Sequence, residues 1–196
     1  TFPQAYMTQT EFNGRDAGVN YSDRAIHKLL EEASKKPWFD NTLFVVVADH
    51  NGGSSGEVDV PLHRYLIPAF VYAPKIIEPQ TVSKLSSQID LMPTVMSLMN
   101  WDYRGKFYGN DILADDFVEQ AFVGNYQKLG FYRDNRLTIL SPDESVKSLE
   151  VEELKLHGVK YKELEENVAD INDTITYYQS ASYLYKKKLT RYEEAQ

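Results

Sequence analysis

The stretch LFVVVADHNGG at residues 43–53 decides how the rest of the chain is interpreted. Its first five residues are apolar and are followed by Ala48, a pattern typical of a strand that is buried on both faces of a sheet. The run ends at Asp49 and His50, whose carboxylate and imidazole can both bind a metal ion. Ligands of open parallel sheets bind beyond the carboxyl ends of the strands, so we expect this point of the chain to carry chemistry.

The overall composition is that of a globular protein without a basic binding surface. The 196 residues are 42% hydrophobic and 26% charged, which suits one sizeable core with a small appendage. A net charge of -8 argues against nucleic acid as a partner and disfavours plain electrostatic attraction to anionic lipids. The sequence has no cysteines, so disulfides and thiolate zinc sites are excluded. Its apolar runs are far shorter than the roughly 20 residues that a membrane-spanning helix needs.

Helix and strand patterns alternate around the opening stretch. Apolar residues recur at helical spacing over residues 19–34, just before it. After it, IPAFVYA at residues 67–73 predicts a second buried strand, and SQIDLMPTVMSLMN at residues 87–100 predicts a helix capped by Asp90. This alternation indicates an α/β fold.

The pattern changes at about residue 117. Three short antiparallel strands are predicted, at residues 121–126, 130–133 and 137–140. The last two strands are expected to form a hairpin across Asp134 and Asn135. Residues 142–164 are charged and mixed, with no predicted element, and residues 165–192 predict a long helix. We expect its tyrosines to pack into the core with their hydroxyls at the rim.

Asp49 and His50 are the best metal-ligating pair in the sequence. Adjacent residues can both reach one metal ion only where the backbone leaves the strand, because within a strand they point to opposite faces. The alternative is structural: an Asp that caps the following turn and a His that is hydrogen-bonded to a backbone carbonyl. From the residues alone these two interpretations are evenly balanced. Two ligands also fall short of the three that a catalytic metal site usually has.

Two further pairs are candidates for binding an anionic group. Ser54 and Ser55 follow the metal-ligating pair in a glycine-rich loop, where their hydroxyls can donate to a phosphate or simply belong to a turn. His63 and Arg64 precede the second predicted strand, where they can contact an anion or form a surface loop. We predict substrate binding for both pairs, with the structural alternative open.

Taken together, four stretches resemble the sulfatase-like branch of the alkaline phosphatase superfamily, close to the group of lipoteichoic acid synthases and phosphoglycerol or phosphoethanolamine transferases. The resemblance lies in NYSDRAIHKLLEEASKKPWFDNTLFVVVADH at 20–50, RYLIPAFVYAPKIIEPQ at 64–80, SSQIDLMPTVMSLMNWDYRGKFYGNDIL at 86–113 and FVGNYQKLGFYRDNRLTIL at 122–140. It covers about residues 1–140 and leaves residues 141–196 as a charged segment and a C-terminal helix that packs on the first part.

The resemblance implies a fold and a chemistry. The fold is the C-terminal half of an alkaline-phosphatase-like sandwich: an α/β arrangement of a mostly parallel sheet and flanking helices, with a small antiparallel β element and a long C-terminal helix. The chemistry is the transfer or hydrolysis of a phosphate or sulfate ester through a covalent intermediate on Thr, Ser or formylglycine. In that scheme Asp49 and His50 match paired ligands of a divalent metal, which is Mn, Zn, Mg or Ca.

The family's nucleophile and first acidic ligand lie in an N-terminal half that nothing here matches. The chain therefore resembles part of a catalytic domain and is expected to be soluble, inactive alone, and weak or lacking in metal binding. Its expected partners are the missing N-terminal half and a phospholipid or other ester substrate, and we also expect self-association. The parent protein is expected on the extracytoplasmic face of a bacterial inner membrane. The alternative is a non-catalytic interaction or regulatory module that keeps the fold.

Overall fold

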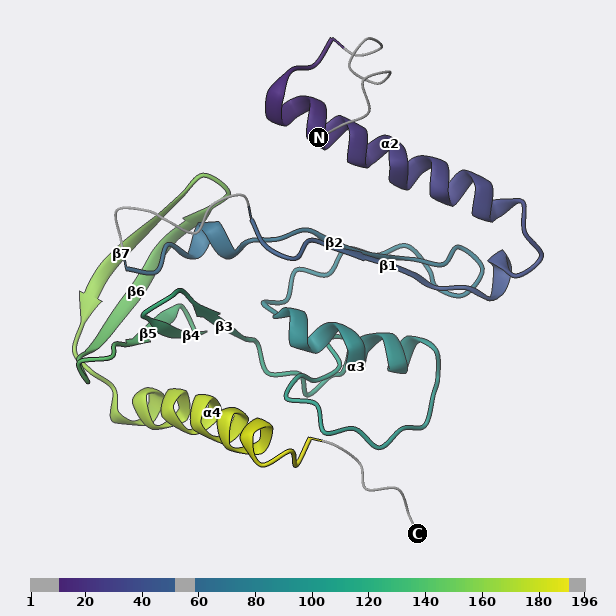
Figure 1. The fold of residues 1–196 in the computed structure, drawn as a ribbon. Coiled ribbons are helices and arrows are strands. Elements are labelled where there is room, and N and C mark those ends of the chain that lie inside the picture. The colour runs from purple at the N-terminus through teal and green to yellow at the C-terminus, as the bar shows by residue number, and fades with distance from the viewer. Residues whose placement is uncertain (1–10, 52–58, 191–196) are drawn as a thin grey trace. The chain divides into compact units, whose positions relative to one another are not determined.

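The computed structural model of the chain describes residues 11–51 and 59–190 (Figure 1). Its helices, strands and short 3₁₀ turns follow in the order α2 Gly14–Ser34, η1 Phe39–Asn41, β1 Phe44–Val47, η2 Leu62–Tyr65, β2 Ala69–Tyr72, α3 Gln88–Leu98, β3 Gln120–Gly124, β4 Leu129–Arg133, β5 Arg136–Leu140, β6 Val146–Lys155, β7 Gly158–Leu164 and α4 Val168–Lys186. These elements form two compact units, one of residues 1–46 and 70–80 and the other of residues 47–69 and 81–196. Helices and sheets are both present, as in the predicted α/β class.

The first unit contains helix α2 and most of the paired strands β1 and β2. The predicted helix is confirmed, but it begins at Gly14, ahead of the predicted start at residue 19. Two glycines and the charged Arg15 and Asp16 mask this turn in the apolar pattern. Three aromatic rings hold the strands and the turn η1 together: the ring centroids of Phe39 and Phe44 lie 5.7 Å apart, and that of Tyr72 lies 6.3 Å from Phe39. Aromatic pairs at these distances stabilise beyond the area that they bury.

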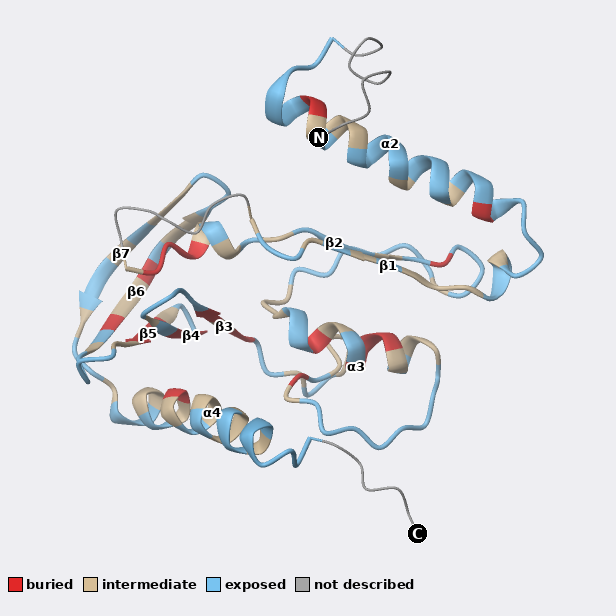
Figure 2. Ribbon diagram, viewed as in Figure 1, coloured by how far each residue is buried: buried red, intermediate tan, exposed pale blue. Residues whose placement is uncertain are grey.

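The prediction that both strands are buried on two faces is wrong. Burial alternates along β1, and Val45 and Val47 each keep 37% of their surface exposed. In β2, Phe70 is 47% exposed, and Figure 2 shows both strands without a buried segment. An apolar run predicts a strand correctly here but not its burial, because burial depends on what packs over each face.

The second unit is built on a five-stranded antiparallel sheet with the order β3-β4-β5-β6-β7. The three predicted strands are confirmed, and so is the hairpin, in which Asp134 and Asn135 both have positive φ, as its tight turn requires. The sheet continues through residue 140, where the family-like part is predicted to end, and that division stays a prediction.

Strands β6 and β7 were not predicted, because residues 142–164 have too many charges to show a clean alternation. The charges are cross-strand partners, as in the ion pairs of Glu150 with Lys162 and Glu153 with Lys160. A bulge between Val151 and Glu153 shifts the register and breaks the two-residue period. Antiparallel pairing therefore extends well beyond the small element that the sequence indicates.

Helix α4 covers one face of this sheet. Tyr178 donates its hydroxyl to the carbonyls of Val123 and Gly130, and burial raises its pKa to about 12. The ring of Tyr177 lies 4.9 Å from that of Phe122. Core packing is thus confirmed for these two tyrosines, whereas it is wrong for Tyr183 and Tyr185, which are exposed. The helix is also shorter than predicted.

Helix α3 has a different cap from the one predicted. Ser87 is the N-cap, and Asp90 is the third helical residue of a capping box: its carboxylate accepts from the Ser87 amide at 2.8 Å. The other oxygen of Asp90 accepts from the Asn110 amide at 2.9 Å. Asp90 is buried and therefore ties the start of the helix to the loop that follows it.

Candidate functional site

The chain bends out of the sheet directly after β1, over residues 48–51. One side of this bend is still attached to the segment before β2. The Ala48 amide donates to the Pro68 carbonyl at 3.1 Å, and the Asn51 side-chain amide donates to the Leu66 carbonyl at 3.4 Å. Since the backbone has left the strand, adjacent side chains here need not point to opposite faces.

Within this bend, Asp49 and His50 each use one side-chain polar atom in a hydrogen bond to a neighbouring backbone group. The second polar atom of each side chain makes no such bond with the described part of the chain. Oδ1 of Asp49 accepts from the His50 amide at 2.9 Å. The His50 Nδ1 lies 2.8 Å from the Asn51 carbonyl, and because a carbonyl only accepts, Nδ1 must carry the proton. The remaining atoms, Oδ2 and Nε2, lie 3.4 Å apart on side chains that are 86% and 77% exposed. The structural and the metal-ligating interpretations are therefore compatible.

This geometry fits two ligands of one divalent metal ion. In the neutral ring Nε2 has a lone pair, as Oδ2 does, so two acceptors face each other and a cation between them is favourable. With metal–ligand distances of about 2.1 Å, two ligands of a tetrahedral site are about 3.4 Å apart. No cluster of three or more His, Cys, Asp or Glu that could hold a metal occurs in residues 11–51 and 59–190. The described residues thus offer two candidate ligands, Asp49 and His50.

A cavity of about 550 Å³ opens beside the pair, within the second unit. Its size is within the usual range for small-molecule sites. Arg64 lines it together with the metal-ligating pair, as do Gln88 and Ser86 from the start of α3. Most of the remaining lining is apolar, contributed by residues such as Leu62, Ile67, Leu85, Ala121, Val123 and Leu154. One side of the cavity is therefore polar, lined by the cationic Arg64 together with Asp49 and His50, and most of the rest is apolar.

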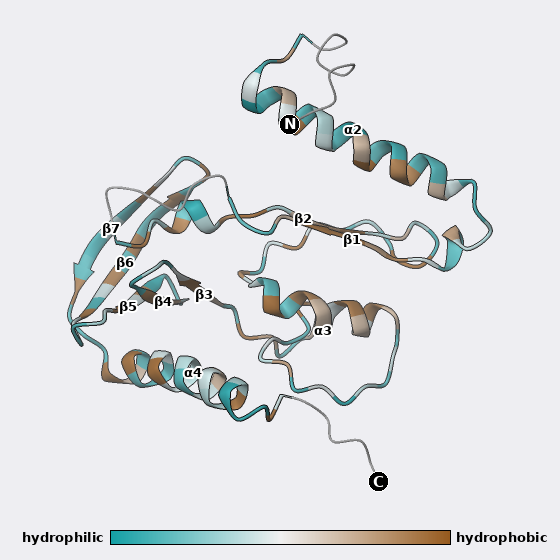
Figure 3. Ribbon diagram, in the orientation of Figure 1, coloured by the Kyte–Doolittle hydropathy of each residue, from teal (hydrophilic) through white to brown (hydrophobic). Residues whose placement is uncertain are grey.

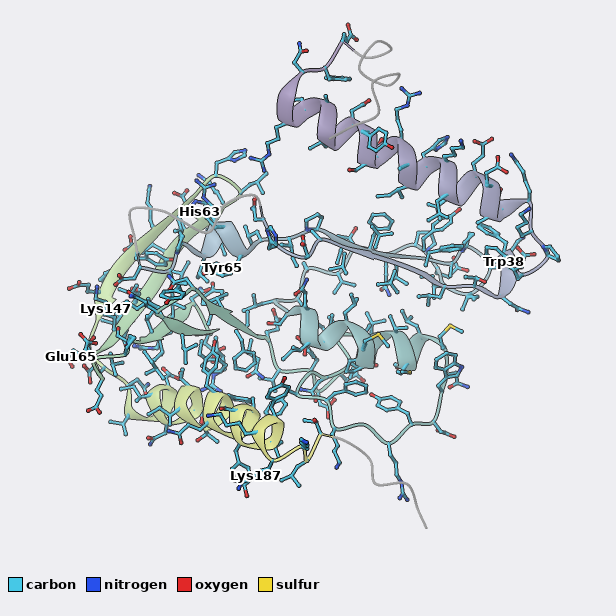
Figure 4. All side chains as sticks on the ribbon, viewed as in Figure 1. Trp38, His63, Tyr65, Lys147, Glu165 and Lys187 are labelled. Carbon is cyan, nitrogen blue, oxygen red and sulfur yellow. The ribbon has the colours of Figure 1, made fainter. Side chains whose placement is uncertain are left out.

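The other predicted site residues are placed differently. His63 does not line the cavity, although it neighbours Arg64 on η2, where Figure 4 labels it. Its Nδ1 is buried and has no hydrogen-bond partner among the described residues. Ser54 and Ser55 lie outside the described residues, so their predicted role stays a prediction. Of the two described residues, His63 and Arg64, only Arg64 lines the cavity beside Asp49 and His50.

The segment that carries Arg64 is fixed to the antiparallel sheet. Tyr161 of β7 donates its hydroxyl to the Val60 carbonyl at 2.6 Å and accepts from the Leu62 amide at 2.9 Å. Burial raises the pKa of Tyr161 to about 12, so the phenol stays protonated at neutral pH. Lys147 of β6 pairs with Asp59 and lowers the pKa of that carboxylate. Sequence reasoning missed Tyr161, because nothing in a charged, unassigned segment distinguishes it.

Figure 4 also labels Tyr65, the last residue of η2, whose hydroxyl donates to the Gly124 carbonyl at 2.8 Å. The segment of residues 59–66 is thus held at several points along its length by strands β3, β6 and β7. The C-terminal sheet therefore positions one wall of the cavity.

Among the described helices, none combines the length and apolarity needed to cross a membrane.

Comparison with protein families gives one assignment. The sequence profile of the sulfatase family, described simply as "Sulfatase", matches residues 2–103. This range contains α2, β1, β2, α3 and the Asp49–His50 pair. The family resemblance predicted from the sequence is therefore confirmed.

Known proteins that are similar to the chain include one from Bacillus and one from Vibrio. The lipoteichoic acid synthase-like protein YvgJ of Bacillus subtilis (strain 168) is 25% identical over 126 residues, which is 55% of this chain and 20% of that protein. The crystal structure of a protein in the alkaline phosphatase superfamily from Vibrio parahaemolyticus matches with a TM-score of 0.86 and 26% identity. That match covers 98% of this chain and 47% of the solved one, so the chain spans less than half the length of either relative.

Proposed function

Because the chain belongs to the sulfatase family, we propose that Asp49 and His50 are two metal ligands of an enzyme that transfers or hydrolyses phosphate or sulfate esters. The observation that carries this proposal is the 3.4 Å separation of Oδ2 and Nε2, with the Nδ1 proton of His50 committed to the Asn51 carbonyl. The Nδ1 hydrogen bond selects the tautomer of the neutral His50 ring in which Nε2 is left for a metal. A divalent ion bound here supplies Lewis-acid stabilisation of an ester oxygen.

The residues around the pair suit an anionic ester. Arg64 lines the cavity beside the pair, and a guanidinium matches the geometry of phosphate or sulfate oxygens. The apolar wall formed by residues such as Leu85 and Val123 suits the organic part of the ester. Phosphoglycerol, phosphoethanolamine and sulfate are the groups that we propose for transfer. The ester substrate, whether a phospholipid or a smaller molecule, would place its charged group at Arg64.

We further propose that sequence outside these 196 residues supplies the nucleophile and the remaining metal ligands. The support is that the chain spans 20% and 47% of its two relatives and that its described residues contribute two ligands. The exposed apolar side chains of β1 and β2, such as Val45 and Phe70, are the surface on which such a segment would pack. Without it, that surface would drive self-association. The name of the Bacillus relative favours a membrane-anchored, outward-facing bacterial parent.

The first experiment measures metal binding by the chain itself, by calorimetry with Mn²⁺ and Zn²⁺. We expect weak binding of one ion, lost in both Asp49→Ala and His50→Ala, because each removes one of two ligands. Asp116→Ala and His27→Ala are the matched controls, since both residues are exposed and lie outside the site. Binding that survives Asp49→Ala would contradict the assignment.

The second experiment measures turnover of an aryl phosphate and an aryl sulfate with added Mn²⁺ or Zn²⁺. For the 196-residue chain we expect rates no higher than the metal blank. For the full-length protein we expect turnover that Asp49→Ala abolishes. Turnover by the short chain would show that it contains its own nucleophile. A full-length protein that binds metal but turns over neither ester would favour the non-catalytic interaction module instead.

A further inference from the structure

One side chain from helix α3 reaches the backbone of the metal-ligating pair. The Gln88 amide nitrogen lies 2.7 Å from the Ala48 carbonyl and 3.3 Å from the Asp49 carbonyl. Both neighbours are carbonyl oxygens, which only accept, so the group that faces them must be the NH₂ of the amide and not its oxygen. The side-chain NH₂ of Gln88 therefore donates to the carbonyls of both peptide groups that precede His50.

Gln88 is itself held in place from several directions. It is the first residue of α3, directly after the N-cap Ser87. The Ser87 hydroxyl accepts from the Phe122 amide of β3 at 3.2 Å, and its backbone amide donates to Asp90. The start of the helix is thus attached both to its own first turn and to the antiparallel sheet. A side chain on such an anchored position can fix the backbone that it contacts.

The contacts of Gln88 complement those on the opposite side of the bend. The Ala48 amide and the Asn51 side chain hold residues 48–51 to Pro68 and Leu66, whereas Gln88 holds the carbonyl groups of the same segment. The His50 ring depends on this segment, because its Nδ1 donates to the Asn51 carbonyl only while the backbone keeps its bent course. Which ring nitrogen is left free for a metal is set by that hydrogen bond.

We propose that Gln88 is a positioning residue for the metal site: by holding the carbonyls of Ala48 and Asp49, it keeps His50 in the tautomer with a free Nε2 and keeps Nε2 close to Oδ2 of Asp49. The consequence for metal affinity rests on the proposed function, whereas the consequence for the tautomer does not. Loss of a group that orients a metal ligand typically lowers affinity about 10-fold to 100-fold.

The experiment compares Gln88→Met, which keeps the length but removes the donors, with Gln88→Glu, which puts a carboxylate against two carbonyl oxygens. Gln179→Glu, on the exposed side of α4, is the control for added charge. The first readout is the ¹⁵N chemical shifts of the His50 ring without metal. We expect the Nδ1–H tautomer in the native chain and in Gln179→Glu, and a mixture of tautomers in both Gln88 variants.

The second readout is a Zn²⁺ titration followed on the His50 ring resonances. We expect affinity about 10-fold lower in Gln88→Met and lower still in Gln88→Glu. This order of affinities separates positioning from electrostatics. If the residue at position 88 acted through its charge alone, the carboxylate of Gln88→Glu would attract the cation and raise the affinity. The order also separates positioning from stability, because Glu in the first turn of a helix is favourable there.

The outcomes distinguish the two proposals. If the native chain binds no Zn²⁺, the metal assignment fails, and the tautomer readout still decides the role of Gln88. If it binds Zn²⁺ and Gln88→Glu binds as tightly or more tightly, the inference about Gln88 is overturned while the metal site stands. An unchanged tautomer in both variants overturns it as well.

Discussion

Strands β1 and β5 both carry large aliphatic side chains but have very different surroundings. Figure 3 colours β1 and β2 as hydrophobic segments, yet Val45 and Val47 in β1 are partly exposed. In β5, Leu137 and Ile139 have no exposed surface, because they lie within the core cluster of the antiparallel sheet. The difference shows that the packing partner decides how much a strand stabilises the protein. It also places the candidate chemistry at the end of the less covered strand.

The largest effect should come from the covered strand. Leu137→Ala removes a fully buried side chain from the core cluster, and we expect it to lower the free energy of unfolding by about 3 kcal/mol. Val45→Ala, on the exposed face of β1, should cost about 1 kcal/mol or less. Urea unfolding followed by circular dichroism measures both. Equal losses would mean that β1 is covered to the same extent in solution.

A smaller but still substantial effect is expected where α3 meets the loop after it. An added Cβ at Gly109 would overlap the backbone carbonyl group of Ile89, so Gly109→Ala forces the backbone of the helix start or of the loop to move. We expect a loss of about 2 kcal/mol, within the usual cost of overpacking. Gly158→Ala is the control, because nothing lies within 4 Å of its added Cβ. A loss of similar size there would contradict the clash as the cause, because Gly→Ala at an uncrowded position reduces the entropy of the unfolded chain and should not destabilise.

The sequence predicts the first half of this fold better than the second. Helix α2, both strands of the small sheet and helix α3 follow from periodicity and caps, even though Ser87 and not Asp90 is the N-cap. Strands β6 and β7 do not follow, because their charges pair across strands and a bulge at Val151 breaks the alternation. Their existence depends on long-range pairing, which a local pattern cannot report.

The site is predicted in the same uneven way. Asp49 and His50 are found from residue type and position, since a buried-looking strand that ends in two possible ligands is a local signal. Gln88 and Tyr161 act through hydrogen bonds to backbone groups 40 and 101 residues away in sequence. Such contacts depend on the folded backbone and involve no distinctive residue type. Only the structure therefore reveals how the pair and Arg64 are held.

An intermediate effect, and one that depends on pH, is expected where α4 covers the sheet. Tyr178→Phe removes the hydroxyl that donates to Val123 and Gly130 and should cost about 1 to 2 kcal/mol. Tyr183→Phe, at an exposed position of the same helix, is the control. Since the pKa of Tyr178 is raised to about 12, the unfolded chain releases this proton near pH 10 while the folded chain keeps it. The tyrosine's contribution is thus complete below pH 10 and is lost towards pH 12.

Urea midpoints measured between pH 9 and pH 11.5 test this directly. The native chain should lose stability across that interval, and Tyr178→Phe should lose less, because one of its titrating groups is gone. Tyr183→Phe should follow the native curve. If Tyr178→Phe and the native chain fall in parallel, the hydroxyl of Tyr178 is more accessible to solvent than its contacts with the two carbonyls indicate.

The smallest effect on stability is expected at the metal-ligating pair itself. The side chains of Asp49 and His50 are mostly exposed, so their contact contributes little to folding. Asp49→Ala should therefore change the free energy of unfolding by less than about 0.5 kcal/mol without metal. A ligand that binds only the folded state adds stability, so millimolar Zn²⁺ should raise the urea midpoint of the native chain and not that of the variant. A large loss of stability without metal would instead mean that Asp49 mainly caps the bend after β1. The role of Asp49 would then be its local hydrogen bond and not metal binding.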